Sequence, residues 1–232
     1  MPPDGLILGF DTAAAHCAAA LVQGGRILAA RSEAMDRGQA ERLFPLLEAV
    51  LRDAGAGWAD LGGIGVGTGP GNFTGVRIAV AAARGIALAR GLPAAGVSRL
   101  EALAAGRPGR WLVAVPGRTG TVYAQAVADG VAAGPVVEAA PGALPAGFAD
   151  GCLGAIGAAA AGLGLASGPR IAGPLTLDPL HEPDPAPAIA RIAAARIASG
   201  AVSRAAGPRP APVYARPPDA APPSDPGPRI LP

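Results

Sequence analysis

Lysine is absent from this sequence of 232 residues, and all nineteen of its basic residues are arginine. A Walker A phosphate loop needs a lysine beside its glycines, and an enzyme that forms a Schiff base needs a lysine amine. Both mechanisms are therefore excluded. Histidine is scarce too, because the chain has only His16 and His181, which lie far apart. These are too few nitrogen ligands for a catalytic metal held by histidines, so we expect no metal site.

Cysteines and long apolar runs are also few. Cys17 and Cys152 sit in separate apolar stretches, and we expect two buried free thiols rather than a disulfide. No run of eighteen apolar residues suggests a membrane span, and the first residues lack the basic segment of a signal peptide. These observations predict a cytoplasmic protein. The net charge is only +2 and the arginines are scattered, which does not favour a main role in nucleic-acid binding.

Small residues dominate what is present. The chain contains 35 glycines and 26 prolines, only 3% of it is aromatic, and much of its hydrophobic half is alanine. Glycine and alanine let backbones approach one another closely. We therefore expect a thin core held together by close backbone packing.

The first 105 residues predict strands and helices in a regular order. Residues 6–11 form a buried strand, two strands flank the turn at Gly24 and Gly25, and 61–67 form a further buried strand. Helices are predicted at 39–55 and 75–90, and Ser98 with Glu101 has the spacing of a capping box. We predict an N-terminal lobe over residues 1–105.

The remainder predicts a thinner second unit and a tail. Two strands are expected near 110–128, a third near 134–140, and a helix at 187–200. From Gly207 onward the chain is rich in proline, which does not suit a helix or a central strand. We therefore divide the chain at 106–206 for a C-terminal lobe and 207–232 for a proline-rich tail.

A glycine-rich loop follows the strand at 61–67 and opens a helix. It has neither the Rossmann spacing of glycines nor the lysine of a P-loop. Asn72 or Thr74 is placed to cap the helix. Two interpretations stay open: the free N–H groups hold an anion, or the glycines shape a tight turn and allow close backbone approach. The loop and the start of its helix contain Gly67, Gly69, Pro70, Gly71, Asn72, Phe73, Thr74, Gly75 and Arg77.

These nine residues match the signature of the TsaB (YeaZ) family, Gly-x-Gly-Pro-Gly-Ser/Asn-Phe-Thr-Gly-x-Arg, which continues into an alanine-rich helix. The first strand with its Asp-Thr turn and the helix from residue 39 are similar to that family as well. The segment PVYARPPDA near the C-terminus resembles the family's ending. The resemblance is strong to about residue 105, patchy beyond it, and specific again in the tail.

The resemblance implies an α/β fold with the two-lobed plan of the actin-like ATPase and sugar kinase superfamily (ASKHA, RNase H-like), in which mixed sheets are flanked by helices. It implies a non-catalytic scaffold subunit that pairs with TsaD when a threonylcarbamoyl group is transferred to the adenosine beside the tRNA anticodon. TsaE joins the larger complex, and little direct contact with tRNA is expected. The subunit has no cofactor of its own, while ATP or ADP could lie at the interface with TsaD. A homodimer is also compatible.

A vestigial nucleotide site is the first candidate site within this chain. The resemblance places Asp11 and Thr12 there, but Ala13 replaces the usual serine, and Pro116 of the second lobe replaces the usual aspartate. Gln39 stands where many relatives have a histidine, which leaves one nitrogen ligand fewer for a metal. One carboxylate without its counterpart cannot clamp a metal-bound triphosphate. Our preferred interpretation is that Asp11 stabilises the turn after the first strand. Its use as a nucleotide ligand is the second interpretation.

The alternative to the scaffold is a stand-alone enzyme, either a weak ATPase or a peptidase-like hydrolase. No G-x-S-x-G elbow occurs. His16 and Cys17 are adjacent, and neighbouring residues on a strand point to opposite faces, which does not suit a nucleophile and its base.

A docking face is the second candidate site. We predict that the helices at 39–54 and 75–90 meet TsaD, because one has an apolar stripe and the other a surface of small residues. The competing interpretation is that these residues are buried in the chain's own core. The predicted contacts are Leu43, Leu47, Val50, Val76, Ala79, Val80 and Ala83.

Overall fold

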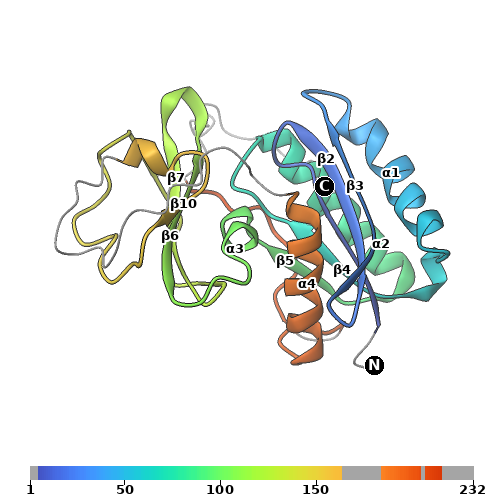
Figure 1. Ribbon diagram of the computed structural model, residues 1–232. Coiled ribbons are helices and arrows are strands. Elements are labelled where there is room, and N and C mark those ends of the chain that lie inside the picture. Colours follow the sequence, from blue (N-terminus) through green and yellow to red (C-terminus); the bar gives the residue numbers. More distant parts are fainter. Residues whose placement is uncertain (1–4, 164–183, 205–206, 216–232) are drawn as a thin grey trace, which may run out of the picture.

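The computed structural model describes residues 5–163, 184–204 and 207–215. Two lobes lie side by side, each built on its own β-sheet (Figure 1). His181 and the part of the predicted tail beyond residue 215 lie outside the described residues.

The first sheet is mixed and has the order β3-β2-β1-β4-β5. β1, β4 and β5 run parallel, while β2 is antiparallel to both β1 and β3. The hairpin predicted at Gly24 and Gly25 joins β2 to β3, and both glycines have positive φ. The strands are β1 Leu6–Asp11, β2 His16–Gln23, β3 Arg26–Ala34, β4 Leu61–Gly67 and β5 Ala94–Val97.

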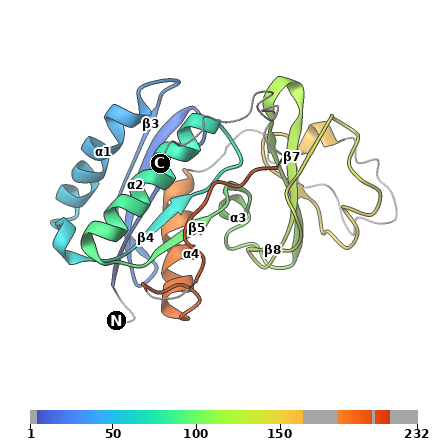
Figure 2. The same cartoon turned by 180° about the vertical axis from the view of Figure 1, so that it is seen from behind.

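Helices cover both faces of this sheet. α1 and α2 lie together on one face and α4 lies on the other (Figures 1 and 2). Pro45 lies inside α1, beyond its first turn, and α2 ends at Gly91 in the left-handed conformation that suits glycine. The helices are α1 Gln39–Asp53, α2 Phe73–Arg90, α3 Arg99–Leu103 and α4 Pro185–Ala198, with a short 3-10 turn, η1, at Trp58–Asp60.

The second sheet is smaller and has the order β10-β6-β7-β8, with β9 paired to β7. β6 and β7 form the long antiparallel pair that the sequence predicts. The elements are β6 Arg110–Pro116, β7 Val122–Ala128, β8 Val131–Ala132, β9 Val137–Ala139 and β10 Ala155–Ile156, with 3-10 turns η2 Arg118–Gly120 and η3 Ala160–Leu163.

α4 belongs spatially to the first lobe, although it follows the second lobe in the chain. It packs on β1 and β4. A Cβ placed on Gly9 or on Gly65 would come closer than 3.0 Å to α4 atoms, so the helix rests directly on sheet backbone, as the expectation of a thin core requires. The predicted C-terminal lobe, residues 106–206, includes α4, but α4 packs on the sheet of the first lobe.

An ion pair ties α4 to the junction between the lobes. Glu101 in α3 accepts a hydrogen bond from the Arg196 guanidinium of α4 and another from the backbone N–H of Ser98, 3.0 Å away. The Ser98 hydroxyl in turn accepts from the Glu101 N–H at 3.0 Å, which confirms the predicted capping box. Arg196 also donates to the carbonyl of Gly96 in β5. The helix is thereby fixed to both the first sheet and α3.

The described part of the tail runs between the lobes without helix or strand (Figure 2). The N–H of Val213 donates to the carbonyl of Thr68 at 2.9 Å, at the end of β4. Pro210 lies close to Gly96 in β5. Residues 207–215 are therefore anchored along the edge of the first lobe that faces the second.

Candidate functional site

The glycine-rich loop packs backbone against backbone on the turn that follows β1. The N–H of Asn72 donates to the carbonyl of Ala13 at 2.6 Å, and the Thr12 hydroxyl donates to the carbonyl of Gly75 at 2.7 Å. A Cβ at Gly71 would fall within 3.0 Å of the Ala13 carbonyl, and one at Gly75 within 3.0 Å of the Thr12 carbonyl. At these two positions only glycine fits without displacement of the backbone.

Three N–H groups in the first turn of α2 already have partners. The side-chain oxygen of Asn72 accepts from the N–H groups of Thr74 and Gly75 at 3.0 and 3.2 Å. The carbonyl of Asn72 accepts from the N–H of Val76 at 2.9 Å. An anion would have to displace this cap. The geometry therefore favours the interpretation that the loop shapes a turn, with Asn72 rather than Thr74 as the N-cap.

Asp11 lies at the end of β1 and is almost fully buried. One carboxylate oxygen accepts from the N–H of Ala13 at 2.9 Å and lies 2.8 Å from Nε2 of His16. The other oxygen is buried and has no partner among the described residues. The first oxygen thus has the turn-stabilising contact expected of this residue.

Asp184, which the sequence did not single out, lies in the same neighbourhood. It caps α4 by accepting from the N–H of Ala186 at 2.9 Å. Burial raises the pKa of its carboxyl, although the bond from Ala186 and the charge of His16 act in the opposite direction. The nearby charge of Asp11 adds to the rise. No pattern in the sequence brings Asp184 to this position, because the contact depends on the return of α4 to the first lobe.

Cys17 does not have the environment of a nucleophile. Burial, helped by the charge of Glu33, raises the pKa of its thiol to about 11, whereas a reactive cysteine needs a lowered pKa. His16 is bonded to Asp11 instead. Both cysteines are buried and free, as the sequence predicts.

A cleft between the hairpins of the two lobes is lined by the charged residues Asp36, Arg99 and Arg118. Its volume is about 340 Å³, and the first lobe lines it with Ala13, Ala14 and Ala15. Pro116 and Arg118 line it from the second lobe. Pro116 offers no carboxylate opposite Asp11, so the described part of the chain does not assemble a paired clamp for a metal-bound phosphate.

The described residues contain neither a cluster of metal ligands nor a membrane-spanning helix. Within 5–163, 184–204 and 207–215, no three side chains of histidine, cysteine, aspartate or glutamate are grouped to hold a metal ion. Among the same residues, no helix has both the length and the apolar character needed to cross a membrane.

The predicted docking residues lie inside the protein and not on its surface. Each of the seven is at most 5% exposed and belongs to the core between the sheet and the α1–α2 layer. The apolar stripe of α1 and the most buried small residues of α2 are covered by this chain's own sheet, which is the competing interpretation. The residues corrected in this way are Leu43, Leu47, Val50, Val76, Ala79, Val80 and Ala83.

The outer faces of α1 and α2 carry other small and apolar residues. Leu88 is 87% exposed and Phe44 is 46% exposed. Ala81, Gly85 and Ala89 are exposed on the same stripe of α2 as Leu88, at helical spacing. A Cβ at Gly85 would meet nothing within 4 Å, so the packing of this chain does not require a glycine at that position.

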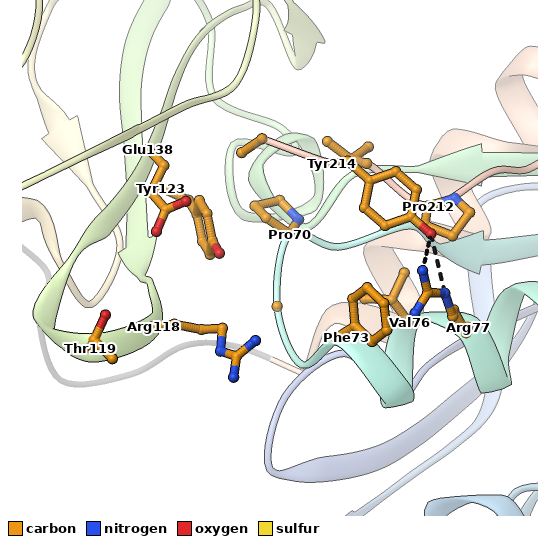
Figure 3. A pocket seen from close by; sticks show the side chains of 13 residues that line it. Pro70, Phe73, Val76, Arg77, Arg118, Thr119, Tyr123, Glu138, Pro212 and Tyr214 are labelled. Atoms are coloured by element: carbon orange, nitrogen blue, oxygen red, sulfur yellow. Dashed lines mark hydrogen bonds between the residues drawn. The ribbon is translucent and has the colours of Figure 1, made fainter. Parts of the chain in front are cut away.

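A larger cavity, of about 500 Å³, opens between the lobes beside the glycine-rich loop (Figure 3). Phe73 and Arg77 of α2 line one side together with Tyr214 of the tail, while Tyr123 of β7 and Arg118 line the other. Phe73 and Arg77 are signature residues predicted from the sequence. The tail motif was noticed as well, but nothing in its spacing shows that Tyr214 reaches Arg77 across the fold.

Comparisons with known proteins find relatives named for threonylcarbamoyl modification of tRNA. The model of the TsaD family, described as tRNA N6-adenosine threonylcarbamoyltransferase, matches residues 31–143. The tRNA threonylcarbamoyladenosine biosynthesis protein TsaB of Escherichia coli is 38% identical over 122 residues, covering 50% of this chain and 52% of that protein. The TsaB protein of Haemophilus influenzae is 33% identical over 98 residues, covering 42% and 41%. The chain thus spans about half the length of these curated relatives.

Solved structures extend the likeness across both lobes. YeaZ from Pseudomonas aeruginosa superposes with a TM-score of 0.70 at 27% identity, covering 90% of this chain and 99% of that one. A second structure from that organism, described as similar to peptidase YEAZ, gives a TM-score of 0.70 at 29% identity and covers 91% and 100%. The expected two-lobed α/β fold with mixed sheets flanked by helices is thereby confirmed. Together with the signature loop, these likenesses support membership in the TsaB (YeaZ) family.

Proposed function

We propose that this chain is a non-catalytic scaffold subunit for formation of threonylcarbamoyladenosine in tRNA, and that it pairs with a TsaD-type transferase in the cytoplasm. The names of the relatives supply the pathway. TsaE would join the larger complex, and ATP or ADP would bind, if at all, at the joint interface.

The observation that carries the pairing is the exposed stripe of α2. Leu88 is a large apolar side chain left 87% exposed, and Gly85 stands beside it in the middle of a helix. An exposed glycine inside a helix costs about 1 kcal/mol relative to alanine. A partner whose backbone approaches α2 closely would offset that cost and bury Leu88.

The absence of catalytic chemistry in the described residues supports the scaffold role over the alternatives. Asp11 has no carboxylate opposite it across the cleft, and the Cys17 thiol has a raised pKa. The match to the TsaD family model raises a second candidate, in which this chain performs the transfer itself. The described part of the chain groups no side chains as a metal site of that enzyme would require.

Leu88→Glu tests the pairing. A charge placed at the centre of the interface would have to be desolvated without a partner, so the variant should no longer co-purify with the TsaD of the same organism. Val131→Glu is the matched control, because Val131 is also exposed, at 60%, but lies in the second lobe. Ala83 is unsuitable as a probe, since it is fully buried and a charge there would disrupt the core.

The outcomes separate the candidates. Loss of pairing with Leu88→Glu but not with Val131→Glu supports the α1–α2 face, whereas pairing by both variants places the interface elsewhere. If Leu88→Glu converts a dimer of this chain into a monomer and leaves TsaD binding intact, the stripe is a homodimer face. Depletion of the protein should lower threonylcarbamoyladenosine in tRNA, and unchanged levels would refute the proposed function. Threonylcarbamoyl transfer by the purified chain alone would favour the enzyme.

A further inference from the structure

We propose that the 500 Å³ cavity between the lobes binds an unstacked nucleotide of single-stranded RNA, with its base against the aromatic rings and its phosphate at Arg118. This inference rests on the proposed role in tRNA modification, and it differs from the expectation of little direct contact with tRNA. Cavities of about 300–1,000 Å³ are the usual size for ligand sites.

One wall of the cavity is a rigid aromatic surface. Phe73 and Tyr214 are 52% and 56% exposed, and their ring centroids lie 6.3 Å apart with planes inclined by 48°. The Arg77 guanidinium stacks 3.2 Å from the centre of the Phe73 ring and donates to the Tyr214 hydroxyl from Nε and Nη2, at 3.2 and 2.9 Å. The arginine thus holds both rings in place while leaving ring surface open. Such a surface suits base stacking, which is tolerant of sequence.

The opposite wall supplies a cation. The Arg118 guanidinium projects from the β6–β7 turn toward the cavity (Figure 3). Among the described residues, this guanidinium makes no hydrogen bond or ion pair. Glu138, also at the cavity, accepts from the Thr121 hydroxyl at 2.8 Å. A free guanidinium facing exposed aromatic rings complements a base that carries one phosphate charge.

The charge pattern favours a phosphodiester over a free nucleoside triphosphate. A triphosphate needs several donors, yet the N–H groups of Thr74, Gly75 and Val76 are already bonded to Asn72, and no lysine exists in the chain. One phosphodiester needs a single cation, which Arg118 provides. A proline-rich peptide would also stack on tyrosine rings, but it would leave Arg118 without a partner.

The test is fluorescence anisotropy of a labelled single-stranded RNA hexamer with the full chain. We expect Arg118→Gln to weaken binding about tenfold and to reduce the slope of log K against log salt by about 0.7, the value for one phosphate contact on a single strand. Arg26→Gln is the control, since it removes the same charge from the exposed start of β3 and should leave affinity and slope unchanged. Tyr214→Leu should weaken binding by about tenfold through lost stacking.

Each outcome decides the proposal. Equal binding by the wild type, Arg118→Gln and Arg26→Gln would overturn it, and this comparison does not depend on whether Tyr214→Leu folds. Equal competition by duplex RNA would also overturn it, because a duplex offers no unstacked base. ATP that binds more tightly than the hexamer, and displaces it, would make the cavity a mononucleotide site instead. If the protein pairs with TsaD but does not bind the hexamer, only this inference is refuted. If it binds the hexamer but does not pair with TsaD, only the scaffold role is refuted.

Discussion

Two glycines in the same helix should respond oppositely to the same added methyl group. Gly75 lies in the first turn of α2, where a Cβ would come closer than 3.0 Å to the backbone carbonyl of Thr12. Gly85 lies further along α2, where a Cβ would meet nothing within 4 Å. Gly75→Ala and Gly85→Ala therefore form a matched pair that isolates the packing of the glycine-rich loop from helix propensity.

The magnitude follows from the contacts of each site. At Gly85, alanine should stabilise the fold by about 1 kcal/mol through helix propensity alone. At Gly75 the same gain is opposed by overpacking against backbone, which costs about 1–3 kcal/mol or more. Displacement of the turn also endangers the hydrogen bond from the Thr12 hydroxyl to the Gly75 carbonyl, worth about 1 kcal/mol when buried. We expect Gly75→Ala to lower the free energy of unfolding by about 2 kcal/mol.

Urea unfolding followed by far-UV circular dichroism measures both variants. The two midpoints should lie on opposite sides of the wild-type midpoint with unchanged m-values. In a thermal scan, a difference of about 3 kcal/mol corresponds to melting temperatures about 10 °C apart in a protein of this size. If both substitutions stabilise the protein equally, the loop does not pack tightly on the turn after β1, and the geometric explanation of its glycines is wrong.

Three further predictions concern buried groups. Because the Cys17 thiol has a pKa of about 11, alkylation by iodoacetamide near pH 8 should be negligible in the native protein and rapid after unfolding; rapid native labelling would contradict the burial. Glu101→Ala should lower the free energy of unfolding by about 2–3 kcal/mol, because it leaves the partly buried Arg196 without its carboxylate partner. Glu48→Ala, at an exposed position of α1, should change the free energy of unfolding little in the same urea titration. The raised pKa of Asp184 means that its contribution is favourable below the unfolded pKa and is lost as pH rises through the folded value. Asp184→Asn, which keeps the cap, should therefore be more stable than wild type at pH 7, with an advantage that shrinks in acid; a constant advantage across the pH range would refute this assignment.

Local features were predictable because they depend on neighbouring residues. The turn at Gly24 and Gly25, the cap formed by Asn72 and the capping box of Ser98 with Glu101 all arise within a few positions of sequence. The predicted docking residues failed for a different reason. Periodicity shows that a helix has an apolar stripe, but it does not show whether the chain's own sheet or another protein buries that stripe.

Long-range contacts could not be predicted from the sequence. Tyr214 meets Arg77 across 137 positions, and a short polar contact of this kind leaves no periodic pattern. The packing of α4 on β1 and β4 was missed as well, because a helix of alanine and isoleucine suits either sheet equally. The glycines at 9 and 65 were visible, but their role depends on knowing which helix lies against them.

The position of α4 has a consequence for how the protein is made. The sheet of the first lobe is complete once residue 97 has been synthesised, but the helix that covers one of its faces is residues 185–198. A ribosome must therefore translate the whole second lobe before that face can be buried, and the nascent chain exposes apolar strand surface meanwhile. A chain that stops before residue 185 should aggregate even though it contains every strand of the first sheet. In chain order, the second lobe lies between two parts of the first, β5 and α4, so any replacement of that lobe would have to return α4 to the same sheet.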